Sequence, residues 1–130
     1  FQAPDGVLWL LWTAQHAGNQ DTAIVRYRQS RDGGKHWGAI ATLLDEPGTF
    51  IRQPISVMPN GNWLLPVFYC RTRPGEKWVG NDDVSAVKIS ADGGKSWRDD
   101  GGITGRLDFR DLQHLSRGGG GGEQRGGSQR

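Results

Sequence analysis

The sequence lacks the features that define several common classes of protein. It has a single cysteine, Cys70, so no internal disulfide framework is possible, and we expect Cys70 to be a small apolar residue in a strand. No run approaches the roughly 20 apolar residues of a membrane-spanning helix; the most apolar stretch is VLWLLW at 7–12. We therefore expect no membrane span.

The chain also lacks a large excess of charge of either sign. The chain has 16 Lys and Arg against 14 Asp and Glu, and its basic residues form no block, so we expect no nucleic-acid partner. The histidines lack metal-ligand spacing, and no Gly-rich turn has the length of a phosphate-binding loop. We therefore expect neither a metal nor a cofactor. The three histidines are His16, His36 and His114.

Short apolar runs bounded by turn residues dominate the first 100 residues. Tight-turn signals, PDG at 4–6 and PNG at 59–61, precede two of them, and no stretch combines a helical period with a cap. The composition therefore predicts an all-β fold. The runs are VLWLLWTA, TAIVRYRQS, GAIATLL, PISVM, NWLLPVFYC and VSAVKIS.

One octapeptide occurs twice. SRDGGKHW at 30–37 returns as SADGGKSW at 90–97, each time after a similar order of turns and strands. Four strands in about 50 residues is typical of a β-propeller blade. We predict two four-stranded antiparallel blades, residues 1–49 and 50–100, followed by a disordered Gly-rich tail at 101–130.

The two ends of the chain suggest a piece of a longer protein. The chain opens at Phe1 without an initiator methionine or a signal peptide, in what reads as the middle of an element, so we expect a fragment. The change of composition near Gly101 fits either a genuine flexible linker or a lost reading frame.

The octapeptide contains the residue types that a tight turn needs. Asp and Ser bond backbone groups, the Gly pair permits positive φ, and Trp buries a large ring. The two copies resemble the Asp-boxes of the sialidase (neuraminidase) superfamily, although His36 and Ser96 replace the usual Thr. The resemblance implies a six-bladed β-propeller, with each box on the outer turn between the third and fourth strands and away from the catalytic centre. The box residues are Ser30, Asp32, Gly34 and Trp37, then Ser90, Asp92, Gly94 and Trp97.

A wider resemblance to sialidase-like proteins covers residues 50–97 and allows two placements. In an opening blade, Arg52 of the RQP motif would hold the substrate carboxylate through its planar fork, and Arg71 would be a second arginine. Asp82 or Asp83 would then be the acid/base catalyst. In a third blade these residues would line the pocket or be structural. We favour the third blade, because a complete unit precedes it.

The loop RTRPGEKWVGNDD at 71–83 is the best candidate for a binding feature. Its arginines, acids and Trp78 suit a sugar-binding rim, and the alternative is a variable outer loop. Sialidases use a Tyr nucleophile with a Glu partner. Tyr27 and Tyr69 lie inside apolar strands, where we expect core rings. The chain therefore lacks a complete catalytic set.

Two functions of different class follow. The first is a fragment of a sialidase-like exo-glycosidase that hydrolyses terminal sialic acid or a related acidic sugar from glycans, and that is inactive alone. The second is a non-catalytic Asp-box propeller segment that binds glycan or protein. The expected partner is a glycan or glycoconjugate. Open blade edges also predict self-association, including a ring of three chains.

Overall fold

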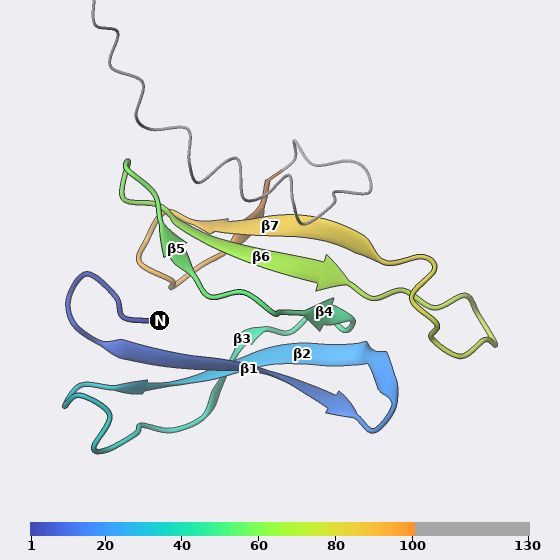
Figure 1. Cartoon of the computed structure of the whole chain (residues 1–130), viewed down its shortest axis with the longest axis horizontal. Coiled ribbons are helices and arrows are strands. Elements are labelled where there is room, and N and C mark those ends of the chain that lie inside the picture. The colour runs from blue at the N-terminus through green and yellow to red at the C-terminus, as the bar shows by residue number, and fades with distance from the viewer. Residues whose placement is uncertain (101–130) are drawn as a thin grey trace, which may run out of the picture.

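A computed structural model describes residues 1–100, and this part of the chain is all-β without a helix (Figure 1). The strands form two antiparallel sheets, which confirms the predicted fold class and is consistent with two propeller blades. The predicted tail at 101–130 lies outside the described residues. No apolar helix of membrane-spanning length occurs in residues 1–100. The strands are β1 (Leu8–His16), β2 (Asn19–Ser30), β3 (Ala41–Leu44), β4 (Thr49–Phe50), β5 (Ser56–Val57), β6 (Trp63–Tyr69), β7 (Val84–Ser90) and β8 (Arg98–Asp99).

The first sheet has the order β1-β2-β3 and is built on a long hairpin. Strand alternation sends Trp9 into the core and leaves Leu10, its neighbour on β1, 49% exposed. The sheet has three strands where we predicted four. Among residues 1–100, only a single bridge, between Gln2 and Leu8, stands in the position of the fourth strand on the outer edge of β1.

The second sheet has the order β4-β6-β7-β8, and β5 also pairs with β6. β4 and β5 lie along the same edge of β6, where the Cys70 amide donates to the Gly48 carbonyl (2.7 Å). Alternate residues direct their backbone groups to one edge, so Pro66 also faces this side. Proline has no N–H to donate to a neighbouring strand. This accounts for the interruption between β4 and β5, the two pieces of the inner strand that pairs with β6.

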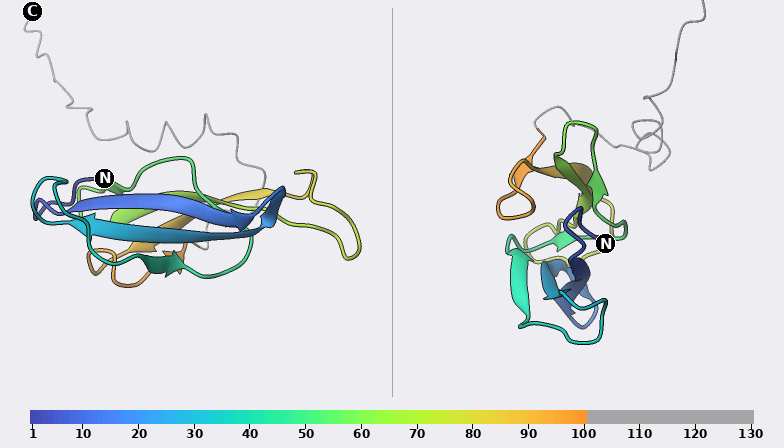
Figure 2. Two further views of the ribbon diagram at one scale, coloured as in Figure 1. Left: turned by 90° about the horizontal axis from the view of Figure 1, so that it is seen from below. Right: turned by 90° about the vertical axis from the view of Figure 1, so that its left-hand side faces the viewer.

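The hydrophobic core lies between the two sheets, which stack face to face (Figures 1 and 2). Trp9 of β1 meets Trp63 of β6 edge to face, with ring centroids 5.4 Å apart. Leu65 and Val25 are fully buried. Burial of each such side chain contributes about 1.5–3 kcal/mol, so the inter-sheet contact stabilises the fold. The buried apolar residues of the cluster are Ala3, Val7, Trp9, Val25, Leu44, Ile55, Trp63, Leu65 and Val67.

The two octapeptide turns have the same hydrogen bonds. In the second turn, Ser90 Oγ donates to Asp92 Oδ1 (2.8 Å) and accepts from the Gly94 amide (2.8 Å). Asp92 Oδ1 also accepts from the Ser96 amide (2.9 Å). The first turn repeats each bond at the equivalent residues, and all four glycines of the two GG pairs have positive φ. The repeated motif therefore builds a repeated structure.

The two turns differ in what surrounds them. The second turn packs on the core: a Cβ at Gly94 would lie 2.8 Å from Trp63 Cζ3 and 2.9 Å from Trp9 Cη2. At Gly34 of the first turn the nearest atom would be 3.7 Å away. Trp97 packs against the core cluster, and its Nε1 donates to the Gly94 carbonyl (3.2 Å). The second turn therefore joins the two sheets.

Candidate functional site

The loop between β6 and β7 is organised around the Asp83 carboxylate. Its Oδ1 accepts a hydrogen bond from the backbone amide of Arg71 (3.2 Å) and another from Trp78 Nε1 (2.9 Å). The half-buried Trp78 indole is thereby held in one orientation. The structure thus brings together three of the residues that we predicted for the site, although Asp83 serves here as an anchor for the other two.

Asp82, the neighbouring acid, is bound within the same loop. Its Oδ2 accepts from Arg73 Nε (3.0 Å), and Oδ1 accepts from Arg73 Nη2 (3.4 Å). This pair is exposed, so it contributes about 0–1 kcal/mol of stability. Both candidate acid/base residues therefore have partners inside their own loop, and a catalytic role for either would require that partner to move.

Arg52 and Arg71 are held over different aromatic rings. The Arg52 guanidinium lies 5.6 Å from the Phe50 ring and 6.0 Å from the Phe68 ring, whereas Arg71 lies 6.0 Å from the Tyr69 ring. Phe68 and Tyr69 are successive residues of β6, so their side chains point to opposite faces of the sheet. This geometry does not bring the two arginines together on one face.

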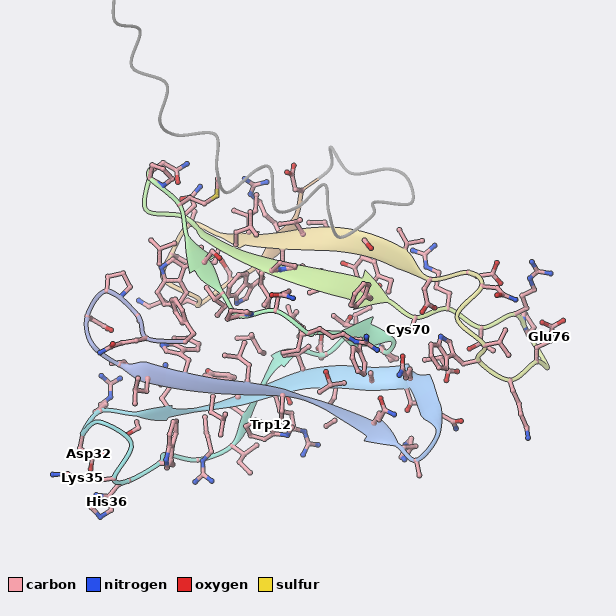
Figure 3. All side chains as sticks on the ribbon, viewed as in Figure 1. Trp12, Asp32, Lys35, His36, Cys70 and Glu76 are labelled. Carbon is pink, nitrogen blue, oxygen red and sulfur yellow. The ribbon has the colours of Figure 1, made fainter. Side chains whose placement is uncertain are left out.

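A groove lies beside Arg52. It has a volume of about 340 Å³ and runs between β1 and the segment that joins β4 to β5. The amide of Ile51 donates to Thr13 Oγ1 (3.3 Å) across one part of it. Trp12, which also lines the groove, is labelled in Figure 3. The lining residues are Phe1, Trp9, Leu10, Leu11, Trp12, Thr13, Ile51, Arg52, Gln53 and Pro54.

Sequence reasoning missed a polar cluster on the second sheet. The Tyr69 hydroxyl donates to Asp99, Lys88 Nζ lies 3.0 Å from Asp99 Oδ1, and the same ammonium lies 5.4 Å from the Tyr69 ring. Burial opposes the charge on Lys88, but its interactions with Tyr69 and Asp99 outweigh this effect and raise the pKa of the ammonium. Burial and the bond to Asp99 raise the pKa of Tyr69.

No sequence signal pointed to this cluster. Lys88 reads as the polar residue of an alternating strand, and Asp99 is about ten residues further along the chain. Only the pairing of β7 with β8, which sets Lys88 opposite Asp99, brings the two charges together. The cluster lies at the outer edge of the second sheet, because Asp99 belongs to β8, the last strand of that sheet.

Cys70 is buried at the end of β6, close to the loop and to Arg52. Its Sγ lies 3.8 Å from Gln20 Oε1, its hydrogen-bond acceptor. Burial, with the nearby Asp83 carboxylate as a second cause, raises the pKa of the thiol to about 12. At neutral pH the group is therefore an unreactive thiol, which agrees with the structural role expected for it.

Metal-ligating residues do not gather in residues 1–100, where no group of three or more His, Cys, Asp or Glu side chains is placed to hold an ion. His36 Nδ1 lies 2.6 Å from Asp32 Oδ2 in the first octapeptide turn. The bond from the backbone amide of His36 and the contact with its ring lower the pKa of Asp32. His36 thus fills the position that Ser96 holds in the second turn.

A family model described as BNR repeat-like domain matches residues 1–115. No curated protein matches the sequence.

Proposed function

The chain belongs to the family of BNR repeat-like domains, of the sialidase-like superfamily, and we propose that it is a two-sheet segment of a sialidase-like exo-glycosidase. In this proposal the segment helps to recognise a terminal acidic sugar, such as sialic acid, on a glycan or glycoconjugate. It does not cleave the glycosidic bond alone.

The observation that supports the proposal most directly is that the Arg52 side chain is exposed and belongs to none of the ion pairs in residues 1–100. Its side chain is exposed on the inner-strand segment of the second sheet, and the Phe50 and Phe68 rings support its guanidinium. The ion pairs within residues 1–100 join His36 to Asp32, Arg73 to Asp82 and Lys88 to Asp99. The N–H donors of the Arg52 guanidinium are therefore available to the carboxylate of a ligand. A guanidinium can bind a carboxylate through two parallel hydrogen bonds.

Arg71 and Trp78 supply a second, weaker argument. The backbone amide of Arg71 and the indole of Trp78 both donate to Asp83, so the loop presents the Trp78 ring in one orientation next to Arg71. A fixed aromatic side chain loses little conformational entropy on binding. In the proposal this loop forms the rim that contacts the sugar or the next residue of the glycan.

A second candidate function is glycan binding without hydrolysis. It is favoured by the engagement of Asp82 by Arg73 and of Asp83 by Trp78, which leaves neither acid free as a proton donor. The tyrosines of residues 1–100 are also occupied: Tyr27 stacks on Trp9 at 5.0 Å, and Tyr69 donates to Asp99. Both candidates predict no turnover of a fluorogenic sialoside by the chain alone, and turnover would contradict both because it would require a complete catalytic set within the chain.

Binding of sialyllactose and of lactose to the full chain tests the proposal by saturation-transfer NMR and calorimetry. We expect the acidic sugar to bind at least tenfold more tightly, because a hydrogen bond to a charged group contributes about 1.5–3 kcal/mol. Arg52→Gln should abolish this preference. Arg73→Gln, an exposed arginine paired within its loop, is the matched control and should retain it. Equal binding of both sugars, or an unaffected Arg52→Gln variant, would refute the proposal.

A further inference from the structure

A second pair of equivalent turns precedes β1 and β6. The turn at 3–7 contains the tripeptide PDG and leads into β1, and the turn at 58–62 contains PNG and leads into β6. The two tripeptides differ only in their middle residue, which is Asp5 in the first turn and Asn60 in the second. One turn therefore has a carboxylate where the other has a side-chain amide.

The two turns are closed by the same hydrogen bonds. In the second turn, the Asn62 amide donates to Asn60 Oδ1 (3.0 Å), and the Gly61 amide donates to the Met58 carbonyl (2.9 Å). The first turn has both bonds at the equivalent residues, with the same lengths. Gly6 and Gly61 also share a left-handed conformation, with φ of 86° and 85°. The structure of this turn is therefore the same with aspartate or asparagine at its centre.

The second turn contains two groups that can react with each other. Of the four asparagines in the chain, only Asn60 is followed by glycine, which has no Cβ to crowd its amide nitrogen. After loss of its proton, the Gly61 nitrogen can attack Cγ of Asn60: the N–Cγ bond forms, the Cγ–Nδ2 bond breaks, and ammonia leaves. Water then opens the cyclic imide, either at Cγ to give aspartate or at the main-chain carbonyl to give isoaspartate. The overall change consumes water and releases ammonia.

The surroundings of the turn favour this reaction in the folded chain. Asn60 and Gly61 are both exposed, so water can enter and ammonia can leave. The bond from the Asn62 amide holds the Asn60 side chain against the turn and stabilises the negative charge that develops on Oδ1 during the attack. The bond from Gly61 to Met58 must open first, and the opening of one hydrogen bond slows the reaction by about two- to tenfold.

We propose that Asn60 is a modification site, at which the folded chain converts asparagine to aspartate with water as the co-reactant. The first turn shows why the fold retains this product, because Asp5 Oδ1 accepts the Val7 amide at 3.0 Å. Isoaspartate instead adds a methylene group to the main chain, which displaces the Gly61 amide from its acceptor. The turn therefore favours aspartate as the product that accumulates.

This modification is separate from the proposed function. The turn at 58–62 lies at the opposite end of β6 from the loop at 71–83 (Figure 1). The reaction uses neither that loop nor Arg52, so failure of sugar recognition does not affect its test. Its consequence is one additional negative charge on the surface just before β6, because aspartate is ionised at neutral pH.

The experiment incubates the full chain in mildly alkaline buffer and follows each asparagine by peptide mapping with mass spectrometry. The reference is the unstructured peptide SVMPNGNWL, residues 56–64. We expect Asn60 to convert at no less than about one tenth of the rate in the peptide, since only one hydrogen bond must open. Enzymatic methylation of isoaspartate should show a ratio of aspartate to isoaspartate at least about threefold higher in the folded chain than in the peptide. Asn19, Asn62 and Asn81 are internal controls that should remain unchanged.

The first turn supplies a matched variant. Asp5→Asn places an Asn-Gly pair in a turn with the same bonds, and it should convert within about threefold of the rate at Asn60. The tolerance of the product is measured separately by urea titration. Asn60→Asp should have the midpoint of the parent chain, whereas Asn60→Ala should have a lower midpoint because the Asn62 amide loses its acceptor.

Four results would overturn the inference. The first is conversion of Asn60 more than about tenfold slower in the folded chain than in the peptide, which would mean that the turn protects the residue. The second is faster conversion at another asparagine. The third is a urea midpoint of Asn60→Asp as low as that of Asn60→Ala. The fourth is an Asp5→Asn variant that stays unmodified at position 5 while Asn60 converts, because the geometry of the turn would then not determine the reaction.

Discussion

The contact of the second octapeptide turn with both sheets yields a sharp mutational prediction. Gly94 and Gly34 occupy equivalent positions, with φ of 87° and 91°. Alanine at either position incurs the cost of left-handed backbone, about 1–2 kcal/mol. Only at Gly94 does the new methyl group also meet indole atoms of Trp63 and Trp9, at 2.8 and 2.9 Å. Overpacking of this kind costs about 1–3 kcal/mol more.

We therefore expect Gly94→Ala to lose about 2–5 kcal/mol of unfolding free energy and Gly34→Ala about 1–2 kcal/mol. Urea titration of the full chain, followed by tryptophan fluorescence and circular dichroism, measures both values. The difference corresponds to a shift of about 1 M in the urea midpoint, with an unchanged slope. Gly93→Ala is a second control in the same turn, because its φ is 69° and a Cβ there would meet nothing within 4 Å.

The comparison has a clear refuting result. Equal losses for Gly94→Ala and Gly34→Ala would mean that the two turns have the same surroundings. The second turn would then not lie against the inter-sheet tryptophans. A loss at Gly93 as large as that at Gly94 would assign the effect to the backbone conformation of the turn alone.

Three further predictions concern single side chains. The pKa of Asp92 is about 2, against 3.8 ordinarily, because the Ser96 hydroxyl and amide donate hydrogen bonds to its carboxylate. The stability that the Asp92 carboxylate gives to the fold should therefore be complete above about pH 4 and be lost as the pH falls to 2. Asp92→Asn should remove that part of the pH dependence of the urea midpoint, and an unchanged profile would contradict this. Cys70, with a thiol pKa of about 12, should react with a thiol reagent at pH 8 on the order of 10³-fold more slowly in the folded than in the unfolded chain, and equal rates would mean that it is accessible. Asp99→Asn should lose on the order of 1 kcal/mol because it strands the buried Lys88 charge, whereas Lys88→Met should be near neutral; equal losses would show that the ion pair itself is stabilising.

Local sequence patterns were sufficient for the strands and the turns. The alternation in TAIVRYRQS predicted β2, and the repeated octapeptide predicted two turns of the same structure. These features depend on short-range chemistry: side chains that alternate across a strand, an Asp and a Ser that bond nearby amides, and glycines that tolerate positive φ. The family resemblance, carried by the same octapeptides, is confirmed by the family match.

The arrangement of the candidate site could not be read in the same way. In the opening-blade placement the spacing of Arg52 and Arg71 matched the two arginines of the sialidase pattern, but the chain places them beside rings on opposite faces of β6. Asp83 was interpreted as an acid, yet its partners Arg71 and Trp78 are twelve and five positions away. Hydrogen bonds across a loop of this length depend on its closure, and no residue pattern in the loop specifies that closure.

By itself, the sequence determined the all-β class, the repeated unit and the chemistry of both octapeptide turns, because each depends on residues only a few positions apart. The tertiary structure alone decided that Gly94 lies against Trp9, that Lys88 meets Asp99, and that the edge of β1 borders a groove. These are relations between strands or between sheets. They arise from the stacking of two sheets and the register of their strands, which bring together groups that are distant in the chain.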